Sequence, residues 1–430
     1  MCSVRGTFAD ASARARAGRA FWCAVTTRMV AVVVTALVDA RVGAYDVSRT
    51  LGEGGTGTGG GVARALASWD AAHFARLASG GYAFEHQHAF YPGFPCVLSA
   101  LAGAVAWTGG GRFGGADAER VARAVGAWFS ALAFACGAAV MSALSESALA
   151  DVGIATAATR LFAMNPAHAF YGCAYTESGF ALAQFAAGAA LMEDRIVLSG
   201  VLFAIATSFR SNGVLNVALV LARVATEARR ARDGGRRAEA ARTLAAGGVA
   251  CALIVAPHCA FAAFGEMRYC TGGNWRPYCR EKSWRNLHGI VPTSMYSFIQ
   301  RHYWGLGFLS SYRTRNVGNI ILGAPAIALG ARVAREFVSA RRARVRDFFR
   351  DDRRHLVDAY VFQLVVMTAV AATYMHVQVA TRFLSTSPAL YWGLARLGST
   401  SEKWRRVVVA YSLSYALVGT ALFAGFYPWT

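Results

Sequence analysis

Long apolar stretches alternate with short polar tracts along this chain of 430 residues. A helix that crosses a membrane needs about 20 mostly apolar residues, and fewer where it is short or interrupted. The stretches that meet this criterion are 20–38, 94–109, 121–144, 152–170, 178–192, 196–222, 243–265, 316–334, 356–375, 384–397 and 407–426. They predict one all-α, polytopic membrane domain over residues 1–430, with about 10–12 transmembrane helices.

Composition supports a membrane protein. Hydrophobic residues make up 55% of the chain and charged residues only 16%, and the mean hydropathy is +0.35. These values are too apolar for a soluble domain of this length.

The formal charge of +20 is carried largely by arginine tracts between the apolar stretches. It does not form one basic face with interleaved aromatic residues, so we expect no nucleic-acid partner. The positive-inside rule places the basic segments 223–242 and 335–355 in the cytoplasm. The loops 39–93 and 266–315 then face the opposite, luminal side.

Two tracts between 152 and 222 place charged residues in apolar surroundings: "FAMNPAHAFYGCAYTES" contains Glu177, and "ATSFRSNGV" contains Arg210. Broken helices at membrane depth occur where protein or water satisfies the freed backbone groups. The sequence therefore predicts breaks that line a cavity, without indicating their side of the membrane.

In the first luminal loop, Trp69, His73 and Leu77 recur at helical spacing and predict an amphipathic helix at the membrane interface. Asp70, His73 and Phe74 share one face of this helix. An Asp shielded by aromatic residues and next to a His can act as a general base. Asp is equally a favoured helix N-cap, and on spacing alone the cap is the preferred interpretation.

Further along the same loop, Glu85, His86 and His88 form a polar cluster. Carboxylates and histidines can bind metal, but no second tract has ligand spacing. A polar loop that lines a sugar site is therefore preferred, and we expect no metal.

Two more polar groups follow. Arg382 lies with His376 and Gln378 near a predicted luminal helix end, where it could bind a phosphate or extend its side chain to the interface. Trp304, in "MYSFIQRHYWGLGF", belongs either to an interfacial aromatic belt or to a surface that stacks on a sugar. Cys270 and Cys279 share one luminal loop and could form a disulfide in an oxidising compartment.

Taken together and in order, seven segments resemble the GPI mannosyltransferase 2 (PIG-V) family. They are "WDAAHF", "GYAFEHQHAFYPGFP", "NPAHAFYGCAYTES", "SFRSNG", "YSFIQRHYWGLGF", "HVQVATRFLSTSPALYW" and the closing "PWT". The resemblance implies a GT-C type glycosyltransferase architecture in the endoplasmic reticulum membrane. It also implies that the second mannose of the glycosylphosphatidylinositol (GPI) core is transferred, in α1,6 linkage, from dolichyl phosphate mannose on the luminal side.

The resemblance further implies an inverting displacement, with Asp70 at the position of the family's catalytic acid. The substrate-binding residues that we expect are His73, Glu85, His86, Glu177, Arg210, Trp304, His376, Gln378 and Arg382. Arg382 is the first choice for the departing phosphate. We expect no cofactor beyond the lipid-linked donor, and the family allows a small membrane partner subunit.

Three other functions are consistent with the residues alone. The chain could use another dolichyl-phosphate-linked sugar and a different acceptor, transport a lipid or glycan, or be a structural membrane subunit. A transporter favours inverted repeats, and none is visible here.

Overall fold

The computed structural model describes residues 10–42, 69–109, 111, 113–149, 151–270, 276–280, 294–342, 354–427 and 429. The parts of the predicted loops at 43–68, 271–275, 281–293 and 343–353 lie outside these residues. Regular structure in the described part is entirely helical, which confirms the all-α class. Six helices, α1, α5, α10, α13, α14 and α17, are long and apolar enough to cross a membrane, and α4, α6 and α8 are shorter apolar helices.

The helices follow the chain in this order: α1 (Ala11–Arg41), α3 (Asp70–Gly80), η2 (Glu85–Ala89), α4 (Gly93–Thr108), α5 (Gly115–Leu149), α6 (Val152–Ala163), η3 (His168–Tyr171), α7 (Glu177–Met192), α8 (Ile196–Phe209), η4 (Ser211–Asn216), α9 (Val217–Asp233), α10 (Arg237–Tyr269), α11 (Pro277–Arg280), α12 (Ser294–His302), η6 (Thr314–Asn316), α13 (Val317–Arg342), α14 (Arg354–Thr373), η8 (Val377–Val379), α15 (Ala380–Leu384), α16 (Pro388–Thr400) and α17 (Glu402–Ala424).

Three of the eleven apolar stretches are not continuous α-helices. The polar tracts between 152 and 222 predicted the first two of these breaks. The stretch 152–170 stops being an α-helix after Ala163, and the stretch 196–222 is divided by η4. The stretch 384–397 is divided between α15 and α16, where Pro388 starts a new helix because its ring lacks an amide hydrogen. Fewer helices therefore run the full membrane thickness than the apolar stretches alone suggested.

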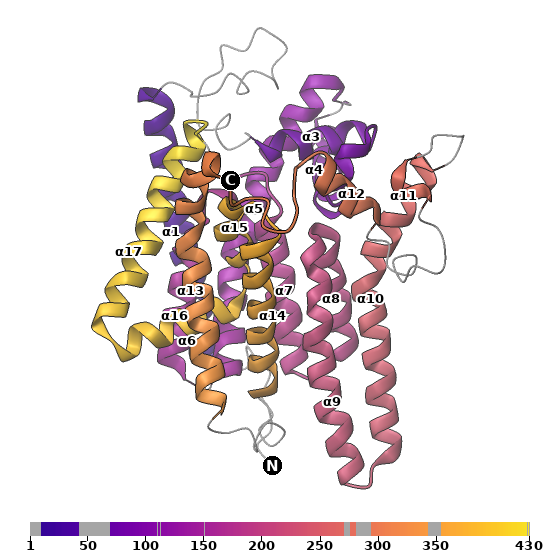
Figure 1. Cartoon of the computed structure of the whole chain (residues 1–430), viewed down its shortest axis with the longest axis vertical. Helices are drawn as coiled ribbons and strands as arrows, with labels where there is room; N and C mark the ends of the chain where they lie inside the picture. The colour runs from indigo at the N-terminus through magenta and orange to yellow at the C-terminus, as the bar shows by residue number, and fades with distance from the viewer. Residues whose placement is uncertain are drawn as a thin grey trace.

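The predicted basic loop 223–242 is almost entirely helical. α9 continues to Asp233 and α10 begins at Arg237, so a turn of only three residues, 234–236, joins them. Gly235 takes φ +74°, a conformation that glycine adopts without a steric penalty. The arginines of this tract consequently lie on the ends of two helices and their tight connection (Figure 1).

The interrupted helices end inside the bundle. At 1.5 Å per residue, α7 is about 24 Å long and α8 about 21 Å, which is less than the roughly 30 Å of a bilayer core. α7 packs between α5 and α8, and α8 packs on α10. The turns at 164–176 and 210–216 therefore lie between longer helices, at the end of the bundle where α3, α12 and the C-terminus are found (Figure 1).

Candidate active site

Asp70 is the first residue of α3, and its side chain is directed away from its own helix. Asp70 Oδ2 accepts a hydrogen bond from Arg382 Nη1 at 2.9 Å, and the backbone N–H of Asp70 donates to the hydroxyl of Tyr175 at 3.1 Å. The N-cap position is occupied by Trp69. The interpretation of Asp70 as a helix cap is therefore wrong, since its carboxylate pairs with a distant arginine instead.

The backbone immediately before Asp70 is strained. Trp69 has φ 60° and ψ −129°, a region that a residue with a Cβ occupies at about 1–3 kcal/mol. The C-terminal segment holds it there, because the Trp69 indole N–H donates to the Phe423 carbonyl at 3.5 Å and its ring stacks on Phe426 at 5.7 Å. This conformation starts α3 with the Asp70 side chain facing Arg382.

Glu177 is the centre of the polar cluster. It is fully buried, and it is the first residue of α7, where the helix dipole stabilises a carboxylate. Its Oε1 accepts hydrogen bonds from Arg210 and from Nε of Arg382. The hydroxyl of Thr176 accepts a further bond from Arg210 at 3.3 Å. One buried carboxylate thus holds two guanidinium groups.

Arg382, in the middle of the short helix α15, joins the two carboxylates. Its Nε donates to Glu177 and its Nη1 to Asp70, while its guanidinium lies 5.1 Å from the centre of the Phe170 ring and 4.8 Å from that of Tyr175. Planar arginine suits such a fork of bonds and can stack on aromatic faces at the same time. Nη2 of Arg382 makes no hydrogen bond to a described residue and is available to an anion.

Arg210 is placed by the break between α8 and α9. Gly213 makes this break possible, because a Cβ at that position would overlap the backbone of Thr207. Ser211, which follows Arg210, shares a hydrogen bond of 3.2 Å with the hydroxyl of Tyr296 in α12. The helix break, and hence Arg210, is therefore tied to the second predicted luminal loop.

These four charged residues balance, with two carboxylates against two guanidinium groups. They come from α3, α7, the α8–α9 break and α15. The exposed fraction of their side chains is not equal. The Asp70 side chain is 30% exposed, whereas those of Arg210, Arg382 and Glu177 are 13%, 12% and 0% exposed. Asp70 is the member of this charged network, defined by these four residues, that a substrate reaches most easily.

In the part of the chain that is described, Glu85 is bonded to residues of the second predicted luminal loop and not to the charged network. Its two carboxylate oxygens accept hydrogen bonds from the hydroxyls of Tyr278 at 2.6 Å and Tyr303 at 2.7 Å, and Arg276 lies 3.4 Å away. The hydrogen bond to Glu85 raises the pKa of Tyr303. Glu85 therefore fastens the second predicted luminal loop to the first and lies apart from the charged network.

A disulfide reinforces the same region, since it joins Cys270 at the end of α10 to Cys279 in α11, with Cα atoms 5.5 Å apart. Tyr278, which precedes Cys279, is the residue that donates to Glu85. The bridge and the Glu85 contacts together hold α11 and α12 near η2.

The remaining predicted residues surround α3 on one side. His73 stacks on Phe90 at 4.9 Å, and burial lowers its pKa, although the nearby Asp70 carboxylate opposes this. His86 lies 5.8 Å from the Tyr303 ring. His376 donates from Nε2 to the Trp304 carbonyl at 2.6 Å. Among the described residues, neither the side chains of these four nor that of Gln378 makes a hydrogen bond or ion pair to the charged network, although His73 lies close enough to Asp70 for the carboxylate charge to act on it.

The structure adds two aromatic residues that the sequence did not single out. Tyr175 accepts from the Asp70 backbone and carries Arg382 on its ring, and Phe170 lies on the same guanidinium. Both lie in "NPAHAFYGCAYTES", whose aromatic residues beside Glu177 were the available signal. No group of three potential metal ligands occurs among the described residues.

These features define a multi-pass helical membrane protein with a largely buried Asp–Arg–Glu–Arg network, of which Asp70 is partly exposed, at the ends of interrupted helices. A family model described as Mannosyltransferase (PIG-V) matches residues 21–430. The chain therefore belongs to the PIG-V mannosyltransferase family, and it is a glycosyltransferase.

Curated relatives have similar length. GPI mannosyltransferase 2 of Chaetomium globosum is 28% identical, with 84% of this chain and 83% of the relative covered. Human GPI alpha-1,6-mannosyltransferase 2 is 27% identical, with 86% and 88% covered. Among solved structures, the oligosaccharyltransferase AglB of Archaeoglobus fulgidus, in complex with an inhibitory peptide and a dolichol-phosphate, matches with a TM-score of 0.48 and 12% identity over 95% of this chain and 56% of its own.

Proposed function

We propose that the enzyme transfers mannose in α1,6 linkage to a GPI precursor, as the second mannose of the GPI core, with dolichyl phosphate mannose as the donor. The names of the curated relatives support the acceptor and the linkage. The donor and the inverting stereochemistry rest on the family resemblance.

The observation that carries the proposal is that, within the described structure, one oxygen of the Asp70 carboxylate is hydrogen-bonded and the other is not. Arg382 holds one of its oxygens, while Oδ1 makes no hydrogen bond to a described residue and the side chain is partly exposed. A carboxylate fixed through one oxygen can accept a proton through the other. Asp70 would take the proton of the acceptor hydroxyl as that oxygen bonds to the anomeric carbon.

The same displacement breaks the bond between the anomeric carbon and the donor phosphate, which leaves as dolichyl phosphate. Its developing charge needs fixed cations. Arg382 retains Nη2, and Arg210 retains Nε and Nη2, without a hydrogen bond to any described residue. In this proposal Glu177 positions both cations, and they neutralise the phosphate without a metal.

The other residues predicted to bind substrate are proposed to have two different roles. His73 stacks on Phe90, whose ring lies 6.1 Å from that of Trp304, and His376 bonds to the Trp304 carbonyl. His73, Trp304 and His376, with His86 and Gln378, are proposed to contact sugar hydroxyls. Each oxygen of Glu85 already accepts a hydrogen bond from a tyrosine hydroxyl, which favours a role in holding the loops over one as a sugar ligand.

We place the reaction in the lumen of the endoplasmic reticulum. The Cys270–Cys279 disulfide supports this side, because disulfides persist in oxidising compartments, and α11 lies at the same end of the molecule as α3 (Figure 1). Both substrates carry lipids and would reach the charged network from the bilayer. A small membrane partner subunit is compatible with this arrangement.

To test this proposal, the wild type, the Asp70→Asn variant and a matched control variant, Asp117→Asn, are expressed in cells that lack GPI mannosyltransferase 2. Asp117 is an exposed carboxylate at the start of α5. Surface GPI-anchored protein is measured by flow cytometry, and the mannose content of accumulated GPI lipids is determined at equal abundance of each protein.

We expect the wild type and Asp117→Asn to restore the surface signal, and Asp70→Asn to leave precursors with one mannose. Restoration by Asp70→Asn would show that the base lies elsewhere. If the well-expressed wild type fails while a known GPI mannosyltransferase 2 succeeds, the proposed acceptor is wrong.

A further inference from the structure

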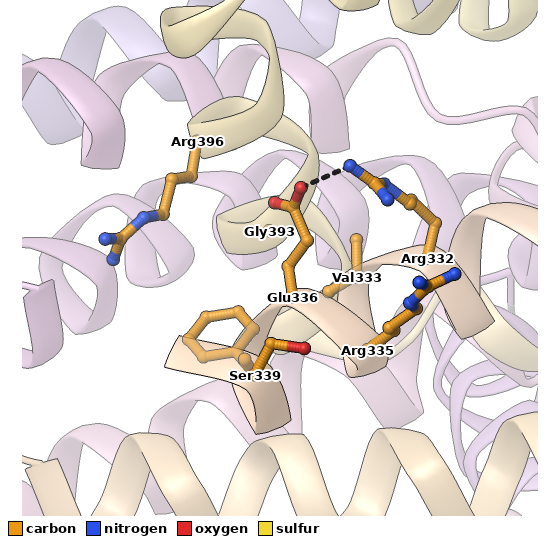
Figure 2. A pocket seen from close by; sticks show the side chains of 8 residues that line it. Arg332, Val333, Arg335, Glu336, Ser339, Gly393 and Arg396 are labelled. Atoms are coloured by element: carbon orange, nitrogen blue, oxygen red, sulfur yellow. Dashed lines mark hydrogen bonds and ion pairs between the residues drawn. The ribbon is translucent and has the colours of Figure 1, made fainter. Parts of the chain in front are cut away.

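A basic cavity lies at the end of the bundle opposite α3, where α13 crosses α16. Its volume is about 400 Å³. The helices approach closely at Gly393, where a Cβ would overlap the side chain of Val333. Phe337 lines the cavity beside this crossing, together with Arg332, Arg335, Glu336, Ser339 and Arg396, which Figure 2 labels.

One of the three arginines is fixed in place. Arg332 Nη2 donates to Glu336 Oε1 at 2.6 Å, and its guanidinium lies 5.3 Å from the centre of the Trp404 ring at the start of α17. Its Nε is buried and makes no hydrogen bond to a described residue. The cavity wall therefore already holds a guanidinium that is fixed in orientation, and its contribution to an anion in the cavity is its charge and not the buried Nε.

The other two arginines leave a positive excess. Arg335 and Arg396 are exposed, and neither has an acidic partner among the described residues. Three arginines and one carboxylate, Glu336, consequently line the cavity, and only Arg332 is directed toward Glu336, whereas the Arg335 and Arg396 side chains extend away from it (Figure 2). Such an excess, with a serine hydroxyl from Ser339 at the edge, fits an anionic group with several oxygen acceptors.

The depth of the cavity indicates which anion is available. The apolar part of α13, VGNIILGAPAIALGA, is followed directly by Arg332, Arg335 and Glu336, so the arginines lie where the hydrocarbon region meets the polar interface. On the same two helices, α13 and α17, Val338 and Val407 are 45% and 42% exposed, as expected for side chains that contact acyl chains. A phospholipid would place its phosphate at the arginines and its chains along these valines.

We propose that this cavity binds the phosphate of an anionic phospholipid headgroup in the membrane leaflet opposite the charged network. The occupied cavity would join α13, α16 and the start of α17 through one ligand. This site uses none of the residues assigned to mannose transfer.

The test compares the purified wild type with Arg335→Gln/Arg396→Gln by native mass spectrometry from detergent. The probes are phosphatidylserine, phosphatidylcholine and inorganic phosphate. The matched control is Arg229→Gln/Arg232→Gln, which removes the same charge from two exposed arginines near the end of α9. Thermal melting in detergent confirms that each variant is folded.

We expect the wild type to retain phosphatidylserine in preference to phosphatidylcholine, and the cavity variant to bind it about tenfold more weakly or worse, since each interfacial arginine contributes about 1 kcal/mol to attraction of anionic lipid. The control should bind like the wild type. Equal losses in both variants would indicate unspecific attraction and overturn the proposal. Equal binding of phosphatidylcholine, or displacement of the lipid by millimolar phosphate, would overturn it as well.

Discussion

Replacing Glu177 with glutamine removes the negative charge that, in the part of the chain the structure describes, contacts both Arg210 and Arg382. Glutamine keeps the size of the side chain and one acceptor oxygen, so packing is preserved. The charged network changes from balanced to a net charge of +1, and the two guanidinium groups, only 12–13% exposed, lose their shared counter-ion.

The expected loss of folding free energy is about 3–5 kcal/mol. Each hydrogen bond to a charged group contributes about 1.5–3 kcal/mol, and Glu177 accepts one from Arg210 and one from Arg382. Removing one partner of a buried ion pair typically costs about 3–5 kcal/mol, because a charge remains buried without compensation. Glutamine can still accept one bond, so the lower end of this range is expected.

The assay is equilibrium unfolding of the purified protein in mixed micelles with increasing sodium dodecyl sulfate. Glu402→Gln is the control, since Glu402 pairs with Arg406 at 3.0 Å and both side chains are exposed, at 51% and 80%, so its loss should leave the free energy of unfolding nearly unchanged. A second replacement, Arg210→Gln, made in the Glu177→Gln background should cost less than it does in the wild type.

An unfolding free energy of Glu177→Gln within about 1 kcal/mol of the wild type would refute this reasoning. Glu177 would then not be the counter-ion of the two arginines. Strictly additive effects of Glu177→Gln and Arg210→Gln would refute their coupling in the same way.

Three further outcomes are expected. Arg382→Lys should lower mannose transfer in isolated membranes by about 100-fold, because one ammonium cannot donate to both carboxylates in a planar fork, and more than a tenth of wild-type activity would contradict this. Burial lowers the pKa of His88 to about 4 from a usual 6.5. As the pH falls from 7 to 5, His88 therefore becomes protonated in the unfolded chain but stays neutral in the folded protein. The free energy of unfolding should fall by about 2 kcal/mol over this range. His88→Phe should remove that loss in unfolding experiments at the two pH values, and an unchanged pH dependence would argue against it. Gly213→Ala should reduce protein abundance and melting temperature through a clash with the Thr207 backbone worth about 1–3 kcal/mol, whereas the open Gly248→Ala should not.

The resemblance of the ordered motifs led directly to the family, which the match over residues 21–430 confirms. Local chemistry was less decisive. The interpretation of Asp70 remained divided between cap and base, because both depend on residues within one helical turn. Its partner Arg382 lies 312 residues away, and spacing carries no information on that distance.

Glu85 illustrates the same limit. Its neighbours in sequence suggested a sugar site, whereas Tyr278 and Tyr303, 193 and 218 residues further along, occupy its oxygens. The basic tract 223–242 likewise appeared to be a loop because arginine is polar, but arginine has high helix propensity and continues α9 and α10.

The sequence by itself determined that this protein is helical and lies in a membrane, since apolar length and the burial of backbone polar groups leave few other structures. It also indicated that Glu177 and Arg210 mark functional breaks, because a charge at membrane depth needs a partner. Only the tertiary structure decided which partners these are. Four charges from four separate elements meet where short helices end, and that meeting depends on how the helices pack and not on any local pattern.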